Sequence, residues 1–321
     1  MGKAVVVLFI MGLTLALTTG DSTAARKYLS LGTGNPGGTY YFIGAGFASI
    51  FNKYVPEVRV IAESTAASEE NFHYILRKKM DMGLAGLSVV EPALEKKLDM
   101  SGIRLMAMGH TSDRHWMVRK ESPVKRVADF RGRRVVVGGP GSGTLIHSRT
   151  ELAILGVTFD DIKPAYLSQS ECITAMKDGT VDVGLIDAGF PVASVLDLAR
   201  QIPLRLIPYS EEELKALLAK RPFCVRIVIP RGTYPGVDTD TAARGSLTAL
   251  FCRRDLDEDL LYRLMKALYE HPKEKDAIHP QAKQWKLENI FRGADYANQN
   301  IPFHPGAVKY LEEKGAWKGR N

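Results

Sequence analysis

The sequence predicts an α/β protein of two similar lobes, each a mainly parallel sheet flanked by helices, joined by a hinge. Past residue 26, short apolar runs alternate with segments of helical periodicity, an order that predicts parallel strands with right-handed crossovers. The same order of strand, glycine loop, helix, strand, helix and strand occurs twice, about a hundred residues apart. A chain of 321 residues is long enough for two lobes with separate cores.

The first unit begins with a short strand and a glycine-rich loop. The strand is expected over 28–32 and the loop over Gly32–Gly38. Strands then follow over 58–63 and 82–87, and Ser68 is expected to cap the helix between them, whose first turn is acidic and whose last turn is basic. Apolar residues with the spacing of one helix face predict a helix directly after the loop; they are Ile43, Phe47, Ile50, Phe51 and Tyr54.

The second unit repeats these elements. A strand over 133–138 leads into the glycine loop Gly139–Thr144, and a helix then runs to Leu155. The rest of the unit is a strand over 165–168, a helix ending at 178–179 and a strand over 181–187. The two third strands are also alike, because Met80–Leu84 reads MDMGL where Val181–Leu185 reads VDVGL.

The remainder of the chain is too short for a third domain of similar size. It is expected to hold strands over 224–230 and 247–252 and helices over 257–269 and 305–313. We therefore expect it to return and complete the first lobe. The predicted division is residues 26–115 with 224–321 for lobe 1 and 116–223 for lobe 2, with hinge crossings near 115 and 223.

The N-terminal segment has the pattern of a secretory signal peptide. Lys3 precedes an apolar run over Ala4–Leu17, and small and polar residues follow as far as Ala25. The run is shorter than the roughly 20 residues that span a bilayer. We expect residues 1–25 to be removed, with cleavage after Gly20 or after Ala25, and the mature protein to be extracytoplasmic (periplasmic).

Cysteine content and charge exclude several classes of protein. The three cysteines include no C-x-x-C pair, so at most one disulfide is possible and a zinc cluster is not expected. The net charge is +7, but the basic residues are dispersed and form no stripe with aromatic residues. This distribution argues against nucleic-acid binding, while the excess positive charge favours small anions.

Each glycine loop lies between the end of a strand and the first turn of a helix. Free N–H groups and the positive end of the helix dipole favour an anion there, and glycine lets the backbone approach it closely. Two such loops facing each other would enclose one ligand from both sides. The alternative for each loop alone is a tight turn.

A dinucleotide-dependent oxidoreductase is the enzymatic alternative. Gly32, Gly34 and Gly37 match G-x-G-x-x-G, and Glu63 ends the next strand as a ribose-binding acid would. Three features oppose it: the expected export, Pro36 within the loop, and the second loop without a corresponding acid. Neither a nucleophile elbow nor a metal-ligand pattern is present, so we predict no catalytic residue, no metal and no cofactor.

Several motifs together resemble one known family, the TAXI solute-binding proteins of TRAP-type transporters. The resemblance extends from about Tyr28 to Tyr310 and depends on motif order rather than on any one motif. The motifs are Gly32–Gly34 with Gly37–Tyr41, Glu63–Thr65 with Ser68 and Asn71, Gly138–Thr144, Asp160–Ile162, Ala188–Pro191, Ile229–Gly236 and His304–Gly306.

The resemblance implies a periplasmic-binding-protein fold (type II-like), and we expect the protein to be a monomer. It implies a small anionic organic ligand, such as a glutamate-like amino acid or a dicarboxylate. The implied partner is a TRAP-type membrane permease driven by an ion gradient. A sensor module that presents its ligand to a membrane receptor is the functional alternative.

Matching motif positions also implies the ligand contacts. In lobe 1 they are Gly37, Gly38, Thr39, Tyr40, Tyr41, Ser64 and Asn71. In lobe 2 they are Ser142, Gly143, Thr144, Ala188, Gly189, Phe190 and Pro191. The sequence departs from the family pattern at Gly86–Ser88, where many relatives have a polar pair, and at Phe190, and both departures should alter the shape of the pocket.

Overall fold

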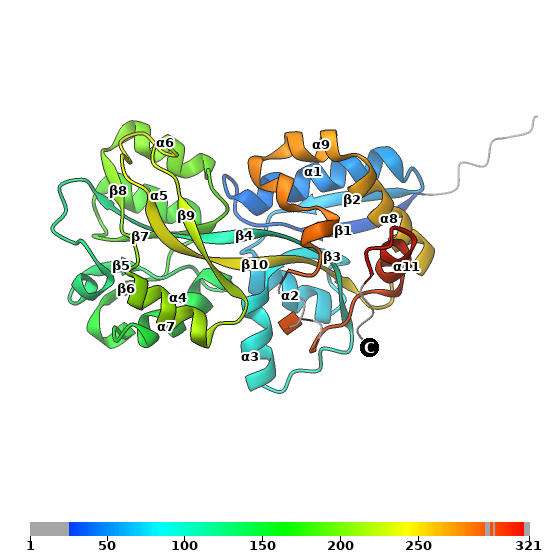
Figure 1. The fold of residues 1–321 in the computed structure, drawn as a ribbon, viewed down its shortest axis with the longest axis horizontal. Coiled ribbons are helices and arrows are strands. Elements are labelled where there is room, and N and C mark those ends of the chain that lie inside the picture. Colours follow the sequence, from blue (N-terminus) through cyan, green and yellow to red (C-terminus); the bar gives the residue numbers. More distant parts are fainter. Residues whose placement is uncertain (1–25, 293–295, 298, 318–321) are drawn as a thin grey trace, which may run out of the picture.

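The computed structural model describes residues 26–292, 296–297 and 299–317, and these form two lobes lying side by side (Figure 1). Two long antiparallel strands connect the lobes, β4 (Ile103–Arg119) and β10 (Thr241–Arg253). The signal peptide predicted over residues 1–25 lies outside the described residues. Within the described part of the chain, no helix combines the length and apolar character needed to cross a bilayer.

In the first lobe a parallel sheet is built on β1 (Lys27–Gly32), which lies between β2 (Val58–Glu63) and β3 (Met82–Gly86). Its crossover helices are α1 (Thr39–Tyr54) and α2 (Ser68–Leu76). Among the residues that the structure describes, this lobe also contains α3 (Val90–Glu95), α8 (Glu258–Glu270), α9 (Pro272–Ile278) and α11 (Pro305–Glu313).

The second lobe carries β7 (Gly184–Ala188), β8 (Leu204–Leu206) and β9 (Cys224–Ile229) on the hinge strands. A parallel pair, β5 (Arg134–Val136) and β6 (Lys163–Ala165), lies beside β7 through a parallel bridge from Val135 to Val183. The helices of this lobe are α4 (Gly143–Ile154), α5 (Gln169–Asp178), α6 (Ala193–Gln201) and α7 (Glu211–Lys220).

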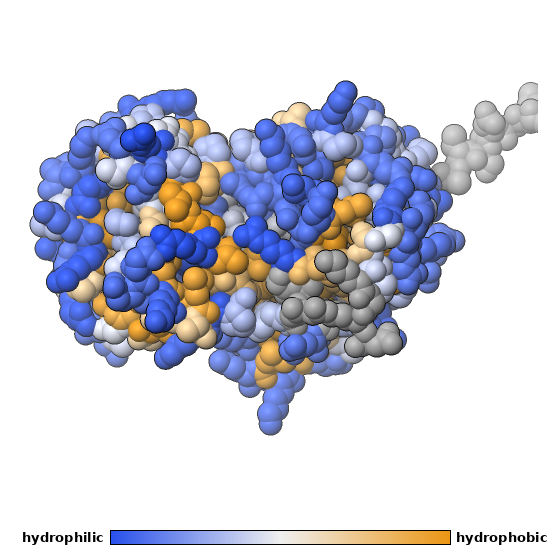
Figure 2. Space-filling model, in the orientation of Figure 1, coloured by the Kyte–Doolittle hydropathy of each residue, from blue (hydrophilic) through white to orange (hydrophobic). Residues whose placement is uncertain are grey.

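One mixed sheet runs through both lobes. Its order is β2-β1-β3-β10-β4-β7, with β8 paired to β4 and β9 to β10. Five short 3-10 helices complete the described elements: Leu87–Val89, Val127–Phe130, Phe159–Asp161, Pro280–Gln284 and Leu287–Asn289. In a space-filling view, hydrophilic residues cover most of one face, and apolar residues gather near its middle, where β9 and β10 run (Figure 2).

Each lobe has its own hydrophobic core. Phe47, Phe251 and Trp285 belong to the core of the first lobe, and Trp116 and Phe130 to that of the second. The stretch from residue 223 to residue 243 contributes to both cores. Phe223 and Cys224 pack in the first, whereas Ile229, Tyr234, Val237 and Ala243 pack in the second, although the sequence assigns them to lobe 1.

The predicted fold class is confirmed: the structure is an α/β protein with helices on a mixed, curved sheet. Two local predictions are wrong. The strand expected over 165–168 lies instead at Lys163–Ala165. Ser68 is the first residue of α2 rather than its cap, and its hydroxyl accepts a hydrogen bond from Gly86 N–H at 3.1 Å. The last predicted strand begins six residues earlier than expected, at Thr241, because it is one of the two long hinge strands.

Candidate functional site

A cavity lies between the two lobes, and residues of both lobes line it. Its atom-free space, with the open mouth included, is about 840 Å³. The first lobe contributes the glycine loop before α1, the loop before α2 and the end of β3. The second lobe contributes the glycine loop before α4, the loop before α5 and the end of β7. Ser112 and Ser246 reach the cavity from the hinge strands.

Four helices begin at the wall of this cavity. Their first residues, Thr39, Ser68, Gly143 and Gln169, all line it. The first N–H groups of a helix have no partner within the helix and carry the positive end of its dipole. Two helices from each lobe therefore direct partial positive charge into one space, which suits an anionic ligand.

The side chains at the cavity wall supply little formal charge. Neither Lys nor Arg is among the described residues that line it, and its ionisable side chains are His147, Asp187 and Tyr40. Burial lowers the pKa of His147 to about 4, and the nearby Arg244 guanidinium acts in the same direction. His147 is therefore neutral at pH 7, and an anion here would be held mainly by backbone N–H groups and hydroxyls.

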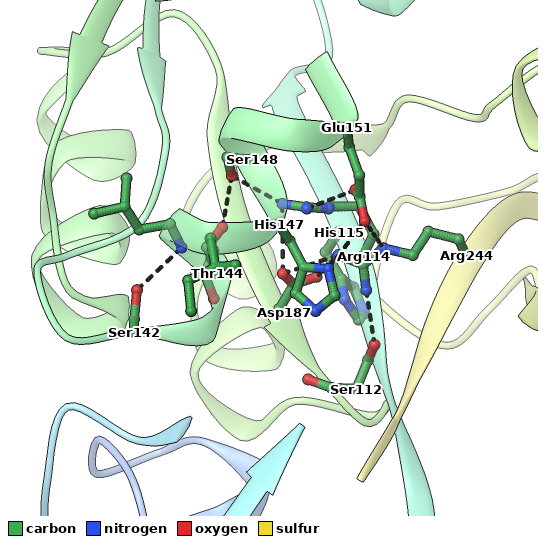
Figure 3. Close-up of polar contacts among 12 residues, drawn as sticks. Ser112, Arg114, His115, Ser142, Thr144, His147, Ser148, Glu151, Asp187 and Arg244 are labelled. Carbon is green, nitrogen blue, oxygen red and sulfur yellow. Dashed lines mark hydrogen bonds and ion pairs between the residues drawn. The ribbon is translucent and has the colours of Figure 1, made fainter. Parts of the chain in front are cut away.

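A buried ionic cluster lies behind the cavity wall (Figure 3). Glu151 of α4 accepts hydrogen bonds at 2.6 Å from both Arg114 of β4 and Arg244 of β10. Asp187 of β7 is 3.4 Å from Arg114 and 3.1 Å from Arg244. Burial alone would raise the pKa of Glu151, but the two guanidinium groups outweigh it and hold that pKa well below its usual range.

The cluster fixes the ligand-facing end of α4 to the hinge. Arg114 also donates to Ser148 at 3.1 Å, and Ser148 donates to the Thr144 carbonyl at 2.8 Å (Figure 3). Arg244 donates to the Ser112 carbonyl at 3.2 Å. All four charged side chains of the cluster are at most 4% exposed, so these contacts hold the helix and both hinge strands in one arrangement.

His147, Glu151 and Cys224 lie close enough together to be considered as metal ligands. Their surroundings do not fit a cation. Both oxygens of Glu151 are taken by guanidinium groups, and Arg221 lies 3.4 Å from His147 Nδ1. Burial raises the pKa of Cys224 to about 12, which keeps the thiol protonated. His147 and Cys224 therefore pack beside the buried ionic cluster, and with Glu151 they do not have the surroundings of a metal site.

One set of contacts between the lobes involves the turn after β7. The Thr39 hydroxyl donates to the Gly189 carbonyl at 2.6 Å. Gln281 Nε2 donates to the Phe190 carbonyl at 2.6 Å, and His279 Nε2 lies 3.1 Å from the Pro191 carbonyl. Because these hydrogen bonds join residues of opposite lobes, the structure represents a closed arrangement.

Half of the contacts implied by the resemblance line the cavity. The Ser142 hydroxyl already donates to the Gly139 carbonyl at 2.6 Å and accepts from Leu145 N–H at 3.2 Å, so it caps α4. The Thr39 hydroxyl is likewise used between the lobes, which leaves the backbone N–H groups in the first turns of α1 and α4 for a ligand. The lining residues of this set are Gly38, Thr39, Tyr40, Ser142, Gly143, Thr144 and Ala188.

The other implied contacts do not line the cavity. The Ser64 hydroxyl donates to the Gly34 carbonyl, and Tyr41 is 38% exposed. The Asn71 amide is fully buried and donates to the carbonyls of Thr33 and Leu84 at 2.9 and 2.8 Å. These residues hold the first lobe together or face outward. Gly37 and the turn Gly189, Phe190 and Pro191 contribute to the contact between the lobes.

The sequence analysis did not identify the ionic cluster, Ser246 or the contacts of His279 and Gln281 with the turn after β7. A signal for the cluster does exist in the sequence. Arg244 interrupts β10, whose residues 241–252 are otherwise apolar or small, and a charge in such a strand needs a partner when it is buried. The nucleotide alternative gains no support, because Glu63 is exposed and does not line the cavity.

Comparisons with known proteins identify relatives over nearly the whole described chain. The model of the NMT1-like family matches residues 31–315. Among solved structures, the periplasmic aliphatic sulphonate binding protein SsuA from Escherichia coli is 18% identical, with a TM-score of 0.50 over 90% of this chain and 79% of that one. The putative sulfonate-binding SsuA from Methylobacillus flagellatus KT is 17% identical, with a TM-score of 0.51 over 91% and 96%.

A third structure, of a protein from Bordetella bronchiseptica RB50, is 14% identical, with a TM-score of 0.57 over 90% of this chain and 98% of that one. At these identities the likeness shows a shared fold and no more than that.

Proposed function

Since the chain belongs to the NMT1-like family and has the fold of periplasmic binding proteins, we propose that it is an extracytoplasmic solute-binding protein. It binds a small carboxylate, such as a glutamate-like amino acid or a dicarboxylate, and delivers it to a TRAP-type permease driven by an ion gradient. It works as a monomer, needs no cofactor and catalyses no reaction.

The observation that carries this proposal is the convergence of helix N-termini from both lobes on one cavity. Thr39 and Ser68 begin helices of the first lobe, and Gly143 and Gln169 begin helices of the second. An anion placed between them interacts with both lobes at once. A ligand shifts an open–closed equilibrium by its difference in affinity for the two states, so such an anion favours closure.

The electrostatics of the wall support a small ligand of low charge. The described lining residues include no Lys or Arg, so a multiply charged phosphate ester would lack a buried counter-ion. A carboxylate accepts hydrogen bonds from backbone N–H groups and hydroxyls in the same way as it does at a helix cap. The support for a TRAP-type permease, rather than another transporter, is the order of the motifs from Tyr28 to Tyr310.

Identification of the bound ligand is the first test. The protein should be purified natively, and mass spectrometry of the denatured sample should detect a released small carboxylate. Calorimetry should then measure binding of L-glutamate, 2-oxoglutarate, propionate and ethanesulfonate to ligand-free protein. We expect binding of at least one carboxylate; if none of the four ligands binds and none co-purifies, the proposed function is wrong.

The energy source of uptake tests the proposed partner. Uptake of the identified ligand into vesicles that contain the partner permease should follow an imposed sodium or proton gradient. Uptake that requires ATP and ignores the gradient would contradict a TRAP-type partner, while binding by the protein itself would remain established.

A further inference from the structure

Three serine hydroxyls from different elements gather around Gly86, at the point where β3 ends on the cavity. A Cβ atom built on Gly86 would lie 3.4 Å from Ser88 Oγ and 3.8 Å from the Oγ atoms of both Ser246 and Ser68. Ser68 begins α2, Ser88 lies in the 3-10 helix after β3, and Ser246 lies on hinge strand β10. All three serines line the cavity.

Two of these hydroxyls are buried without a partner. Ser88 and Ser246 are 0% exposed, and neither Oγ has a hydrogen-bond partner among the residues that the structure describes. A buried hydroxyl without a hydrogen bond destabilises a protein, and natural structures avoid it unless a ligand or an ordered water completes the site. Both hydroxyls therefore remain available to a group bound in the cavity.

The third hydroxyl is also available as a donor. Ser68 Oγ accepts a hydrogen bond from Gly86 N–H at 3.1 Å, and an accepting hydroxyl still has its own proton to donate. The cluster thus offers up to three O–H donors within one small volume.

The N-terminus of α4 meets this cluster from the opposite lobe. A Cβ atom built on Gly143 would lie 3.0 Å from Ser68 Oγ and 3.7 Å from Ser88 Oγ. Gly143 and Thr144 are the first two residues of this 12-residue helix, so their N–H groups have no partner within it. The three serine hydroxyls, from the first lobe and the hinge, and the backbone donors of the second lobe therefore line the same cavity.

We propose that Ser68, Ser88 and Ser246, with the N-terminus of α4, form an oxyanion site that binds the acid group of the ligand, a carboxylate or a sulfonate. This inference rests on the proposed function and identifies where in the cavity the acid group lies. The site is complete only when the lobes are closed, because its hydroxyl and backbone donors come from different lobes. Binding of the acid group thereby couples recognition to closure.

Gly86 provides the sharpest test because its missing side chain leaves the space for the acid group. Its backbone is extended, with φ −71° and ψ 148°, which alanine adopts readily. The nearest atom to a Cβ there is 3.4 Å away, so Gly86→Ala should fold normally while its methyl group occupies the site. Gly102→Ala is the matched control, because a Cβ on Gly102 has no described atom within 4 Å.

Calorimetry with the best-binding carboxylate or sulfonate of the four probes named above should separate these variants. We expect Gly86→Ala to weaken binding about a hundredfold or more, and Ser88→Ala and Ser246→Ala about tenfold each, with no change for Gly102→Ala. Thermal unfolding without ligand supplies a second readout. Serines with a structural role would lose stability as alanine, whereas these two should keep or gain it because the lost hydroxyl had no partner.

The outcomes distinguish this inference from the proposed function. If wild-type protein binds a carboxylate and the Gly86 and serine variants bind it equally well, the oxyanion site is wrong and the proposed function stands. If only the sulfonate binds and Gly86→Ala abolishes its binding, the site stands and the carboxylate ligand is wrong. If wild-type protein binds none of the probes and no small carboxylate co-purifies, both are overturned.

Discussion

Gln281 provides a way to weaken closure of the lobes without altering the cavity. Its amide Nε2 donates to the Phe190 carbonyl of the other lobe at 2.6 Å, and its side chain is largely buried against Gly189. Gln281 does not line the cavity. Gln281→Ala therefore removes a contact between the lobes and leaves the residues that line the cavity in place.

The expected size of the effect follows from this single hydrogen bond. A typical hydrogen bond contributes about 0.5–1.5 kcal/mol net, which is the free energy that the closed state would lose. The apparent affinity of a ligand that binds the closed state is proportional to the population of that state. The variant should therefore bind about two- to twelvefold more weakly.

Calorimetry with the co-purified ligand measures the affinity, and small-angle X-ray scattering measures closure with and without ligand. Gln201→Ala is a matched control, because the Gln201 amide also donates to a backbone carbonyl, that of Asp197 at 3.1 Å, but within one helix. Equal affinities for the two variants, with unchanged scattering, would refute the idea that this contact stabilises closure.

Three further predictions follow from burial and charge. Glu151→Gln leaves the Arg114 and Arg244 guanidinium charges poorly compensated, so the free energy of unfolding in urea should fall by about 3–5 kcal/mol. Glu211→Gln, which breaks an exposed pair, should cost little, and similar losses for both variants would contradict a special role for the cluster. Acidification should also destabilise the protein. Burial lowers the pKa of His110, His115 and His147 to about 3 or 4 in the folded protein. In the unfolded chain the same side chains are protonated near pH 6.5. The stability that these histidines contribute is present above about pH 6.5 and is lost as the pH falls. Asp113 has the opposite effect: burial raises its pKa to about 7, so it is protonated in the folded protein first, and its contribution to stability rises as the pH falls. Unfolding should therefore take up about two protons between about pH 6 and 4.5, and the free energy of unfolding should fall by about 2.7 kcal/mol per pH unit; a flat profile in urea titrations would contradict this. Finally, all three cysteines are free and at most 7% exposed, so a thiol reagent should label them only after unfolding; labelling of the native protein would disprove their burial.

Local features of the sequence predicted much of the fold. The helix after the first glycine loop and the strand over 58–63 could be predicted because the period of apolar residues follows directly from helix or strand geometry. Gly179 ends α5 in the left-handed region, with φ 69°, as the end of that pattern implied. The position of each glycine loop between a strand and a helix could be predicted for the same reason, because it depends on residues close together in the chain.

Ser68 shows where local reasoning fails. Its sequence context is that of a helix cap, but its hydroxyl accepts instead from Gly86, a residue of β3. The choice between the two roles depends on how α2 lies on the sheet, which no local pattern specifies. The same limit applies to Asn71 and Ser64, whose polar groups hold loops of the first lobe in place rather than facing the cavity.

The sequence by itself determined two lobes that present paired glycine loops, because hydrophobic periodicity and the chemistry of helix termini depend on residues close together in the chain. Only the tertiary structure decided which side chains those loops enclose. Ser246 and Ser88 are separated by more than a hundred residues, and Arg244 meets Glu151 from another element of the fold. Such groups come together only when the hinge strands pair and the lobes close, so their meeting is a property of long-range packing.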